Sequence, residues 1–334
     1  MRVAVDAMGG DKAPAEIVKG VVAALDGLPA EDRVVLFGDR AAVEPLLADV
    51  GPGREKVEIV HCSQTVGFDE HPVEALRHKR DSSILKMASA ASAGEVDAVI
   101  SAGNTGAMVA ACQMKMRLLE GVNRPGIAVV IPTFSGPVTI CDVGANVQCK
   151  AVNLHQYAQM GAIYSEAVLG IKRPRVGLMS IGEEDAKGNE LVKQVRQMLK
   201  ADPKLNFQGN VEGRDVARGF VDVIACEGFV GNVILKLTEG LAEGLIKTIV
   251  NELIRESPAL AKQFEPVVKN IWKRHDYNEY GGAPLLGVDG ICIICHGSSN
   301  YRAIFNAIRV AREFARQGVN QRIIEDLKAA ASPA

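Results

Sequence analysis

Long hydrophobic runs, a leader segment and a strong net charge are all missing from this sequence. No apolar run approaches the roughly 20 residues that a membrane-spanning helix needs, and the opening MRVAVDAMGGD has neither a basic region nor a cleavage site. The formal net charge of the 334 residues is −2, so bulk electrostatics gives no case for binding nucleic acid. We therefore expect a cytoplasmic protein that is not integral to a membrane, with peripheral contact at a membrane surface left open.

Paired cysteines are missing as well. The seven Cys are scattered along the chain, and their odd number favours reduced thiols. Cys292 and Cys295 have the CxxC spacing, but they lie inside the apolar run GICIIC, and residues three apart on a strand face opposite sides. Because a free Cys usually behaves as a small buried hydrophobe, we predict that both pack in the core and that neither binds a metal.

The chain is instead rich in short apolar runs that alternate with helical patterns. Continuous Val and Ile runs separated by helices are typical of a mainly parallel sheet that helices cover on both faces. The length fits two domains or one large α/β unit, and we expect one α/β domain over residues 1–334. A helix is predicted to begin at Pro14, and a hairpin at Phe134-Ser135-Gly136 adds antiparallel pairing. The predicted strands are 2–6, 33–39, 56–62, 97–101, 126–132, 137–143, 175–182, 221–228 and 290–297.

The ends of these strands carry the chemical signal. Nearly every apolar run finishes in Gly with small polar residues, and in an open parallel sheet the carboxyl ends of the strands share one edge, where ligands bind. One such turn is ordinary loop chemistry, and Ser298 or Ser299 would also serve as an N-cap of the next helix. Turning alone does not require Asn or Asp beside Gly seven times. The turns are DAMGGD (6–11), SAGNTG (101–106), DVGAN (142–146), GEEDAKGN (182–189), NVEGRD (210–215), CEGFVGN (226–232) and HGSSN (296–300).

The turn over residues 101–106 predicts an anion site. The stretch EVDAVISAGNTGAMVAA (95–111) contains a strand, a tight Gly turn and a helix start, which is the arrangement that binds phosphate. It lacks the Lys of a P-loop and the third Gly of a dinucleotide fingerprint. The pattern therefore leaves open which anion other than a nucleotide binds here.

Taken together, the motifs resemble those of the acyl-carrier-protein:phosphate acyltransferases of bacterial phospholipid synthesis. The match extends from Val3 to about Arg316, with the motifs in the order of that family. One departure is Cys226-Glu227-Gly228, where an Asp is expected in the middle, so Glu227 is left out of the predicted site. The resemblance rests on DAMGGD, SAGNTGA, DVGAN, EEDAKGN, NVEGRD, FVGNVILK, YGGAPLLGVDG and HGSS.

The resemblance implies a fold, a reaction and partners. The fold is a three-layer α/β/α unit similar to phosphotransacetylase and isopropylmalate dehydrogenase, and the protein is a homodimer without a cofactor. The reaction converts an acyl-carrier-protein thioester and inorganic phosphate reversibly to acyl phosphate and free carrier protein. The acyl phosphate then supplies a membrane glycerol-3-phosphate acyltransferase. Phosphate is therefore the expected anion of the turn.

This reaction demands little acid–base chemistry. Phosphate is largely anionic near neutral pH, with a relevant pKa of about 6 as in phosphomonoesters, and the leaving thiol has a parent pKa of about 8.5 if Cys is a guide. What remains is to position two anionic reactants and to stabilise a tetrahedral oxyanion. The predicted phosphate-binding residues, in which glycines allow close backbone approach, are Gly9, Gly10, Ser101, Gly103, Asn104, Thr105, Gly106, Asn146 and Ser298.

Three side chains are predicted to take part in the transfer itself. Lys187, in a loop flanked by Gly, would neutralise phosphate or the oxyanion, although loop lysines are usually exposed and solvated. Asn232 would donate to the thioester oxygen. His296 would protonate the leaving sulfur, since His titrates near neutral pH, but a structural role in its turn is equally open.

Residues 237–275 predict a helical hairpin with two possible uses. Leu and Ile repeat four apart from Leu241 to Leu253, and Ser257-Pro258 interrupts the pattern. Over residues 257–275, four Lys or Arg oppose one Glu, a local charge of +3. The two helices would form a dimer interface, or the second would meet acidic carrier protein or anionic lipid headgroups. The predicted docking residues are Leu260, Phe264, Lys269, Trp272 and Lys273.

Three other functions remain alternatives. A nicotinamide-dependent dehydrogenase on a related fold would need an adenosine-binding feature and bind a nucleotide column, and GxGxxG is absent. A serine hydrolase using Ser298 would form an acyl-enzyme, and GxSxG is absent. A non-catalytic phosphate-binding module would have no use for an acyl site or a carrier-docking surface.

Overall fold

The protein forms two compact units. The computed structural model describes residues 1–275 and 277–331, without the side chains of 272–278 and 329–331. Unit 1 comprises Met1–Val129, Ile163–Lys172 and Tyr280–Ala334, and unit 2 comprises Val130–Ala162 and Arg173–Glu279. The expectation of one domain over residues 1–334 stays a prediction, since two compact units can belong to one domain.

The sheet of unit 1 is mainly parallel. Its strands lie in the order β3-β2-β1-β4-β11-β10, with β5 next to β10. All neighbours from β3 to β11 are parallel, whereas β10 is antiparallel to both β11 and β5. The strands are β1 (Arg2–Asp6), β2 (Arg33–Gly38), β3 (Val57–His61), β4 (Ala98–Ser101), β5 (Gly126–Thr133), β10 (Ala283–Leu286) and β11 (Ile291–Ile294).

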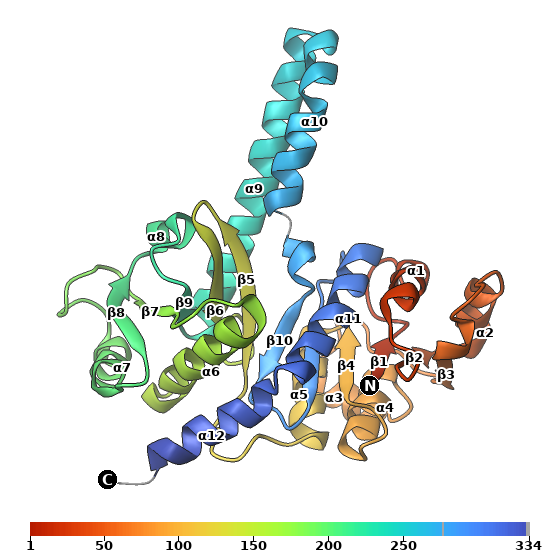
Figure 1. Cartoon of the computed structure of the whole chain (residues 1–334), viewed down its shortest axis with the longest axis horizontal. Coiled ribbons are helices and arrows are strands. Elements are labelled where there is room, and N and C mark those ends of the chain that lie inside the picture. Colours follow the sequence, from red (N-terminus) through yellow and green to blue (C-terminus); the bar gives the residue numbers. More distant parts are fainter. Residues whose placement is uncertain (276, 332–334) are drawn as a thin grey trace. The chain divides into compact units, whose positions relative to one another are not determined.

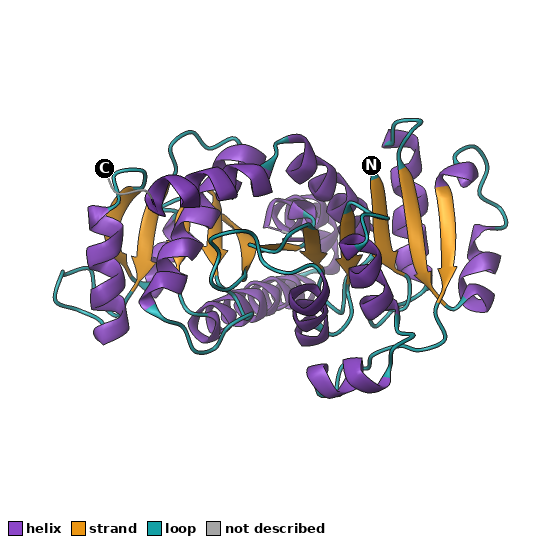
Figure 2. Ribbon diagram, turned by 90° about the horizontal axis from the view of Figure 1, so that it is seen from below, coloured by secondary structure: helices purple, strands orange, loops and turns teal. Residues whose placement is uncertain are grey.

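Helices cover both faces of this sheet (Figures 1 and 2). The connection from β1 to β2 and the connection from β3 to β4 run in opposite directions along the strand order. Right-handed crossovers therefore place the helices of these two connections on opposite faces. The helices of unit 1 are α1 (Ala15–Ala24), α2 (Arg40–Val43), α3 (Pro72–His78), α4 (Ser83–Ser92), α5 (Thr105–Lys115), α11 (Tyr301–Arg316) and α12 (Val319–Ala331), with 3-10 turns η1 (Leu25–Gly27), η2 (Glu44–Leu47), η3 (Arg54–Lys56) and η4 (Tyr277–Tyr280) near them in the chain.

Close packing in unit 1 depends on the pairing of α1 with α11. A Cβ on Gly20 of α1 would lie 2.6 Å from Cβ of Ile304 on α11, so only Gly fits at this contact. The inward face of α11 is apolar at helical spacing, and Ile304 and Ile308 are fully buried. Burying such side chains contributes about 1.5–3 kcal/mol each, which holds these two helices together over the sheet.

The sheet of unit 2 has four parallel strands in the order β6-β9-β7-β8. The end of β5 neighbours β6, and the turn at Phe134 and Ser135 joins them as the predicted antiparallel hairpin. Helix α6 begins in unit 2 and ends in unit 1. The elements are β6 (Gly136–Cys141), β7 (Arg175–Met179), β8 (Asn206–Val211), β9 (Val223–Ala225), α6 (Ala151–Leu169), α7 (Glu190–Ala201), α8 (Gly213–Arg218), α9 (Gly228–Glu256) and α10 (Pro258–His275).

Helices α9 and α10 form the hairpin that the sequence predicts. They lie side by side and extend away from the strands of unit 2 (Figure 1). The break falls at Ser257, between the two helices, because Pro258 can begin a helix but cannot continue one. The first helix begins at Gly228, nine residues before the predicted start of the hairpin at 237. None of the described helices is long and apolar enough to cross a membrane.

The predicted fold class is confirmed, with small corrections. All nine predicted strands are present, but β8 and β10 were not predicted. Their sequences explain this, because NFQGNV in β8 has no apolar run and APLL in β10 is short and contains Pro. Helix α1 begins at Ala15, one residue after the predicted Pro14. The prediction that Cys292 and Cys295 pack in the core is confirmed, since both are buried.

Candidate functional site

Each of the seven Gly-rich turns follows the carboxyl end of a parallel strand. In unit 1 these strands are β1, β4 and β11, and in unit 2 they are β6, β7, β8 and β9. Within each unit the turns therefore gather at one edge of the sheet, as the sequence predicts. The predicted catalytic and phosphate-binding residues fall into two groups, one at the edge of each unit.

A buried carboxylate organises the first turn of unit 1. Asp6, at the end of β1, is 1% exposed, and its Oδ2 accepts a 2.7 Å hydrogen bond from Ser101 Oγ at the end of β4. Its Oδ1 accepts from Met8 N at 3.1 Å, and Ser101 Oγ in turn accepts from Gly103 N at 3.0 Å. Burial raises the pKa of Asp6, and these hydrogen bonds oppose the shift in part.

Glycines let the turns of β1, β4 and β11 meet. A Cβ on Gly9 would lie 2.5 Å from Asp6 Oδ2 and 2.7 Å from Gly103 N, so no other residue fits there. Gly10 has φ +111°, a conformation that favours Gly. The next residue, Asp11, donates its N–H to Gly297 O in the β11 turn at 2.8 Å. Ser101, Gly9 and Gly103 thus pack against Asp6 and hold the turns at this edge of the sheet together.

Asn104 is the N-cap of α5, and its side chain is engaged with the protein. Its Oδ1 accepts from Ala107 N at 2.9 Å. Its Nδ2 donates toward three carbonyl oxygens of one loop, those of Gly67 at 3.0 Å and of Phe68 and Glu70 at 3.2 Å. These protein partners already use both polar atoms of the Asn104 amide. Direct contact of this side chain with phosphate stays a prediction.

The first turn of α5 is open at its surface. Thr105 and Gly106 are exposed, and as the first two helical residues they have backbone N–H groups outside the helical hydrogen-bond ladder. The helix dipole places partial positive charge at this end. Gly106 must be small for another reason, since its Cβ would lie 2.7 Å from Pro72 of α3. This turn can therefore bind an anion through backbone groups.

The β11 turn fixes the tautomer of His296. Ser298 donates its backbone N–H to His296 Nδ1 at 3.2 Å, and Ser298 Oγ lies 2.8 Å from the same nitrogen. Because a backbone N–H can only donate, Nδ1 accepts, and the neutral ring carries its hydrogen on Nε2. Asn300 caps α11 by accepting from Arg302 N at 2.9 Å, so capping by Ser298 or Ser299 is wrong.

A second buried carboxylate organises the edge of unit 2. Asp142, after β6, is fully buried. Its Oδ1 accepts from Gly144 N and Ala145 N at 3.1 and 3.0 Å, and its Oδ2 accepts from Asn146 N at 2.7 Å. The Asn146 amide donates to Asp142 at 3.3 Å and to Tyr157 Oη at 2.8 Å. Asn146, like Asn104, is bound to neighbouring protein groups, and its role as a phosphate ligand stays a prediction.

The start of α9 packs closely against Asp142. A Cβ on Gly228 would lie 2.7 Å from Asp142 Oδ2, and a Cβ on Gly231 would lie 2.0 Å from Asp142 O. Gly228 N donates to Asn146 O at 2.9 Å. Glu227 occupies the N-cap position of α9, without a capping hydrogen bond from its side chain. The first turn of α9 is consequently closed by protein.

Two predicted catalytic residues of unit 2 are accessible. Asn232 is exposed on α9, and its Oδ1 lies 3.9 Å from the position of a Cβ on Gly144. Lys187 is exposed in the loop after β7, where its Cγ lies 2.8 Å from the position of a Cβ on Gly182. Within the part of the chain that the structure describes, no ion-pair partner holds the Lys187 ammonium. Both side chains can meet a ligand, and their catalytic roles stay predictions.

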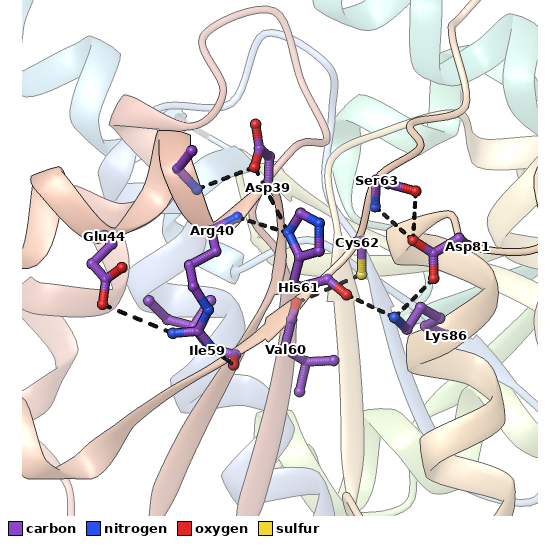
Figure 3. Close-up of polar contacts among 11 residues, drawn as sticks. Asp39, Arg40, Glu44, Ile59, Val60, His61, Cys62, Ser63, Asp81 and Lys86 are labelled. Atoms are coloured by element: carbon purple, nitrogen blue, oxygen red, sulfur yellow. Dashed lines mark hydrogen bonds and ion pairs between the residues drawn. The ribbon is translucent and has the colours of Figure 1, made fainter.

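A polar network at the ends of β2 and β3 was not predicted (Figure 3). Asp81 Oδ2 accepts from the backbone N–H and the hydroxyl of Ser63, both at 2.7 Å. Lys86 Nζ donates to Asp81 Oδ1 at 2.9 Å and to His61 O at 2.6 Å. These bonds hold the pKa of Asp81 below its usual value. The hydroxyl beside the strand end, in HCS, was the only sequence signal for this network.

The predicted docking residues lie on α10, with mixed outcomes. Leu260 is half-buried, and Phe264 is 45% exposed. Lys269 forms a 2.6 Å ion pair with Glu265, which reduces the basic character of this helix face. The side chains of Trp272 and Lys273 lie outside the described residues. Docking by this helix stays a prediction.

Unit 2 also contains an apolar cavity of about 240 Å³ that the sequence did not reveal. Residues of β5, α8 and α9 line it, among them Ile131, Val216, Leu235 and Ile246. Among the described residues, no group of three or more His, Cys, Asp or Glu is arranged to hold a metal ion.

Comparison with known sequences identifies relatives over nearly the full length. A family model described as "Fatty acid synthesis protein" matches residues 1–322. A phosphate acyltransferase of Desulfitobacterium hafniense is 48% identical over 332 residues, covering 98% of each chain. Phosphate acyltransferases of Heliobacterium modesticaldum and Geobacter sulfurreducens are 48% and 46% identical, and cover 97% and 98% of this chain and 96% and 94% of their own.

Comparison with solved structures identifies the same fold in distant sequences. A phosphotransacetylase from Streptococcus pyogenes superposes with a TM-score of 0.62 at 16% identity, over 94% of each chain. A branched-chain phosphotransacylase from Enterococcus faecalis gives 0.56 at 15% identity, over 94% of this chain and 98% of its own. A 4-hydroxythreonine-4-phosphate dehydrogenase from Klebsiella pneumoniae gives 0.52 at 13% identity, over 94% and 99%. At these identities the likeness shows the fold alone.

Proposed function

The chain belongs to the phosphate acyltransferase family and is an acyltransferase, and we propose that it transfers an acyl group from acyl-carrier protein to inorganic phosphate. A phosphate oxygen attacks the thioester carbon, and a C–O bond forms. The C–S bond then breaks, and the sulfur leaves with a proton as the free thiol of the carrier. The products are acyl phosphate and free carrier protein, and the reverse reaction uses the same groups.

One observation carries the phosphate part of this proposal, the open first turn of α5. Thr105 and Gly106 are exposed residues at a helix N-terminus, where their backbone N–H groups would donate to phosphate oxygens. The buried pair of Asp6 and Ser101 fixes the turn that precedes them. Gly9 and Gly10 let the β1 turn pack closely against the turns of β4 and β11, since a Cβ at either position would meet atoms of those turns.

His296 supplies the proton to the leaving sulfur in this proposal. To act as an acid the ring takes the charged form, with hydrogen on both nitrogens: Nε2 donates to the sulfur, and Ser298 Oγ, 2.8 Å from Nδ1, accepts from that nitrogen. The ring is left neutral, and the proton that phosphate loses on forming acyl phosphate balances the one that the sulfur gains. General-acid catalysis of this kind is worth about 10²–10⁴-fold in rate. Ser298 therefore acts by orienting the ring.

The exposed groups of unit 2 have a separate role in the proposal. Lys187 neutralises charge on phosphate or on the oxyanion, and Asn232 donates to the thioester oxygen. Their exposure supports this assignment, since each has a polar group free to reach a ligand. Losing one donor to an oxyanion costs about 10²–10³-fold in turnover. Asn146 supports the edge by holding Asp142.

A homodimer formed through α9 belongs to the same proposal. Phe229, Val233, Leu237, Leu241 and Leu245 repeat four apart along α9, and each is 48% to 62% exposed. Apolar surface of this extent favours a partner. Changing Leu241 and Leu245 together to Glu is expected to give a monomer in sedimentation, whereas Leu46→Glu, which alters an exposed Leu of unit 1, is expected to leave the dimer intact.

The wider setting of the reaction is also proposed. Acyl phosphate is consumed by a membrane glycerol-3-phosphate acyltransferase, and the protein acts in the cytoplasm with peripheral contact at the membrane. The half-exposed Phe264 and neighbouring Leu260 on α10 support such contact. Changing both to Glu is expected to reduce co-sedimentation with anionic liposomes while the dimer persists. Loss of the dimer instead would make these residues part of an interface.

The reaction itself is tested with the purified full chain. Acyl-carrier protein loaded with a fatty acid is mixed with inorganic phosphate, and acyl phosphate is trapped with hydroxylamine and identified by mass spectrometry. The proposal expects product only when both substrates are present, and His296→Gln is expected to lower turnover about 10²-fold or more. Absence of acyl phosphate under these conditions would refute it.

Direct transfer is tested with the acyl donor alone. The proposal expects no acyl mass on the protein after mixing, because phosphate is the nucleophile. A stable adduct on Ser298 or on a Cys would show an acyl-enzyme and a nucleophilic mechanism instead.

A further inference from the structure

The loop from Cys62 to His71, which joins β3 to α3, offers a large apolar side chain beside the polar turns of unit 1. Phe68 is 51% exposed, although a buried position is the rule for Phe. The turns that the loop borders contribute glycines, Asn104, His296 and Ser298, which are suited to phosphate and to polar atoms. An acyl thioester is largely apolar and needs a surface of another kind.

The ring of Phe68 lies against the β11 turn. Its Cζ and Cε1 are 3.0 and 3.2 Å from the position of a Cβ on Gly297, the residue between His296 and Ser298. Any larger residue at 297 would displace the ring. One part of Phe68 is thus packed on the turn that carries the proposed proton donor, and the remainder faces solvent.

The side chains of Asn104, Glu70 and Lys79 hold the loop in this position. Asn104 Nδ2 donates to the carbonyl oxygens of Gly67, Phe68 and Glu70, at 3.0 to 3.2 Å. Glu70 Oε1 accepts from Gly67 N at 2.6 Å and from Lys79 Nζ, whose charge keeps the pKa of Glu70 low. Lys79 Nζ also donates to Thr65 O at 2.7 Å.

The start of the loop is anchored by the network of Figure 3. Ser63 is bound to Asp81 through both its backbone and its hydroxyl. Both ends of the loop are therefore fixed, and the ring of Phe68 lies against the Gly297 turn. A preorganised apolar group costs little entropy on binding.

We propose that Phe68 binds the apolar part of the acyl donor next to the His296–Ser298 turn, and that Asn104 is a positioning residue that holds the Phe68 loop. This proposal rests on the proposed acyl transfer. The ring has no hydrogen-bond donor for phosphate, and the negative faces of aromatic rings do not favour anions. Covering its exposed part with alkyl or thioester atoms removes apolar surface from water, which is favourable.

Replacement of the ring tests the contact. Phe68→Ala is expected to raise KM for the acyl donor about tenfold, the effect of losing part of one buried Phe, and to leave KM for phosphate unchanged. Phe68→Leu, which retains apolar area, is expected to restore most of the affinity. The matched control is Phe220→Ala, which removes another exposed Phe, 60% exposed, from unit 2. An unchanged donor KM in Phe68→Ala would overturn the proposal.

Asn104→Ser separates positioning from direct contact with phosphate. Ser is as good an N-cap as Asn, so α5 keeps its cap while the loop loses the amide donor. The proposal expects donor KM to rise and phosphate KM to stay constant. In the Phe68→Ala background the same change is expected to add nothing, because Asn104 acts through Phe68. A rise in phosphate KM alone would show Asn104 to be a phosphate ligand and would overturn the positioning role.

Binding without turnover distinguishes this proposal from the proposed reaction. Calorimetric titration with an acyl-pantetheine thioester measures Kd in the absence of phosphate. If the native protein makes no acyl phosphate but binds the thioester about tenfold more tightly than Phe68→Ala does, the proposed reaction fails and the Phe68 site stands. If acyl phosphate forms and the two Kd values agree, the reaction stands and the Phe68 site fails.

Discussion

The sheet edges of unit 1 and unit 2 that carry the Gly-rich turns each have a buried Asp at the end of a strand. They differ in whether the helix that starts beside this Asp is exposed. Asp6 in unit 1 and Asp142 in unit 2 are both inaccessible and accept backbone N–H groups from their own turns. In each unit a glycine packs against this Asp. A Cβ on Gly9 would lie 2.5 Å from Asp6 Oδ2, and a Cβ on Gly228 would lie 2.7 Å from Asp142 Oδ2. The carboxylate in both cases replaces the hydrogen bonds that a sharp turn cannot make within itself.

The helix starts beside these two carboxylates differ. In unit 2 the first turn of α9 is pressed onto Asp142, so Gly228 and Gly231 are buried. In unit 1 the carboxylate is bound to Ser101 instead, and the first turn of α5 is exposed at Thr105 and Gly106. Of these two helix starts, that of α5 is the exposed one, which supports placing phosphate there.

The largest expected effect comes from a substitution in the first turn of α9, which packs against Asp142. Gly231→Ala would place Cβ 2.0 Å from the backbone oxygen of Asp142, and we expect the free energy of unfolding to fall by about 3 kcal/mol, the upper range for overpacking. Gly240→Ala in the same helix has no atom within 4 Å. It is expected to raise stability by up to about 1 kcal/mol, because Ala favours helix. Denaturant unfolding measures both, and equal effects would show that α9 is not locked onto Asp142.

The next effect concerns the open turn. Thr105→Pro removes one backbone donor but fits the first helical position, and Asn104, at φ −62° and ψ 109°, already has a conformation allowed before Pro. A hydrogen bond to a charged group contributes about 1.5–3 kcal/mol, so KM for phosphate is expected to rise about 10- to 150-fold. Glu190→Pro, at the first position of α7, is the control. Unchanged use of phosphate in Thr105→Pro would remove α5 from the site.

The positions of the turns follow from sequence, because a strand end is marked where an apolar run meets Gly. The sheet class, the helical hairpin and the buried Cys292 and Cys295 follow from patterns of the same kind. β8 was hidden because NFQGNV has no apolar run. The turns, the sheet class, the hairpin and the buried Cys residues depend on local composition, which can be read from the sequence alone.

The engagement of side chains did not follow from sequence, because it depends on which distant segments meet. Asn104 was predicted to face phosphate, yet its amide donates to a loop that lies 34 to 37 residues earlier in the chain. Ser101 contacts Asp6 across 95 residues. The network of Ser63, Asp81 and Lys86 was missed for the same reason.

A smaller effect tests the support of Asn146. Tyr157→Phe removes the hydroxyl that accepts from Asn146 Nδ2 at 2.8 Å, and the loss is expected to cost about 1 kcal/mol of stability. Phosphate KM is expected to stay constant if the anion binds only in unit 1. Tyr164→Phe, in another fully buried Tyr, is the control for loss of a buried hydroxyl. A clear rise in phosphate KM in Tyr157→Phe alone would argue for an anion site at Asn146 as well.

The smallest effect is the pH dependence that Asp6 confers. Burial raises its pKa above the ordinary 3.8, so between those two values the folded state binds more protons than the unfolded state. The free energy of unfolding must then fall as pH rises from 3.8 through the raised pKa, and stay level above it. Asp6→Asn cannot titrate, and urea unfolding of this variant is expected to lack that decline. Asp81→Asn is the opposite control, since the lowered pKa of Asp81 contributes stability above 3.8 that is lost as pH falls. For each variant, the difference in free energy of unfolding from the native protein is plotted against pH. If the two plots slope in the same direction, burial does not control the charge of Asp6.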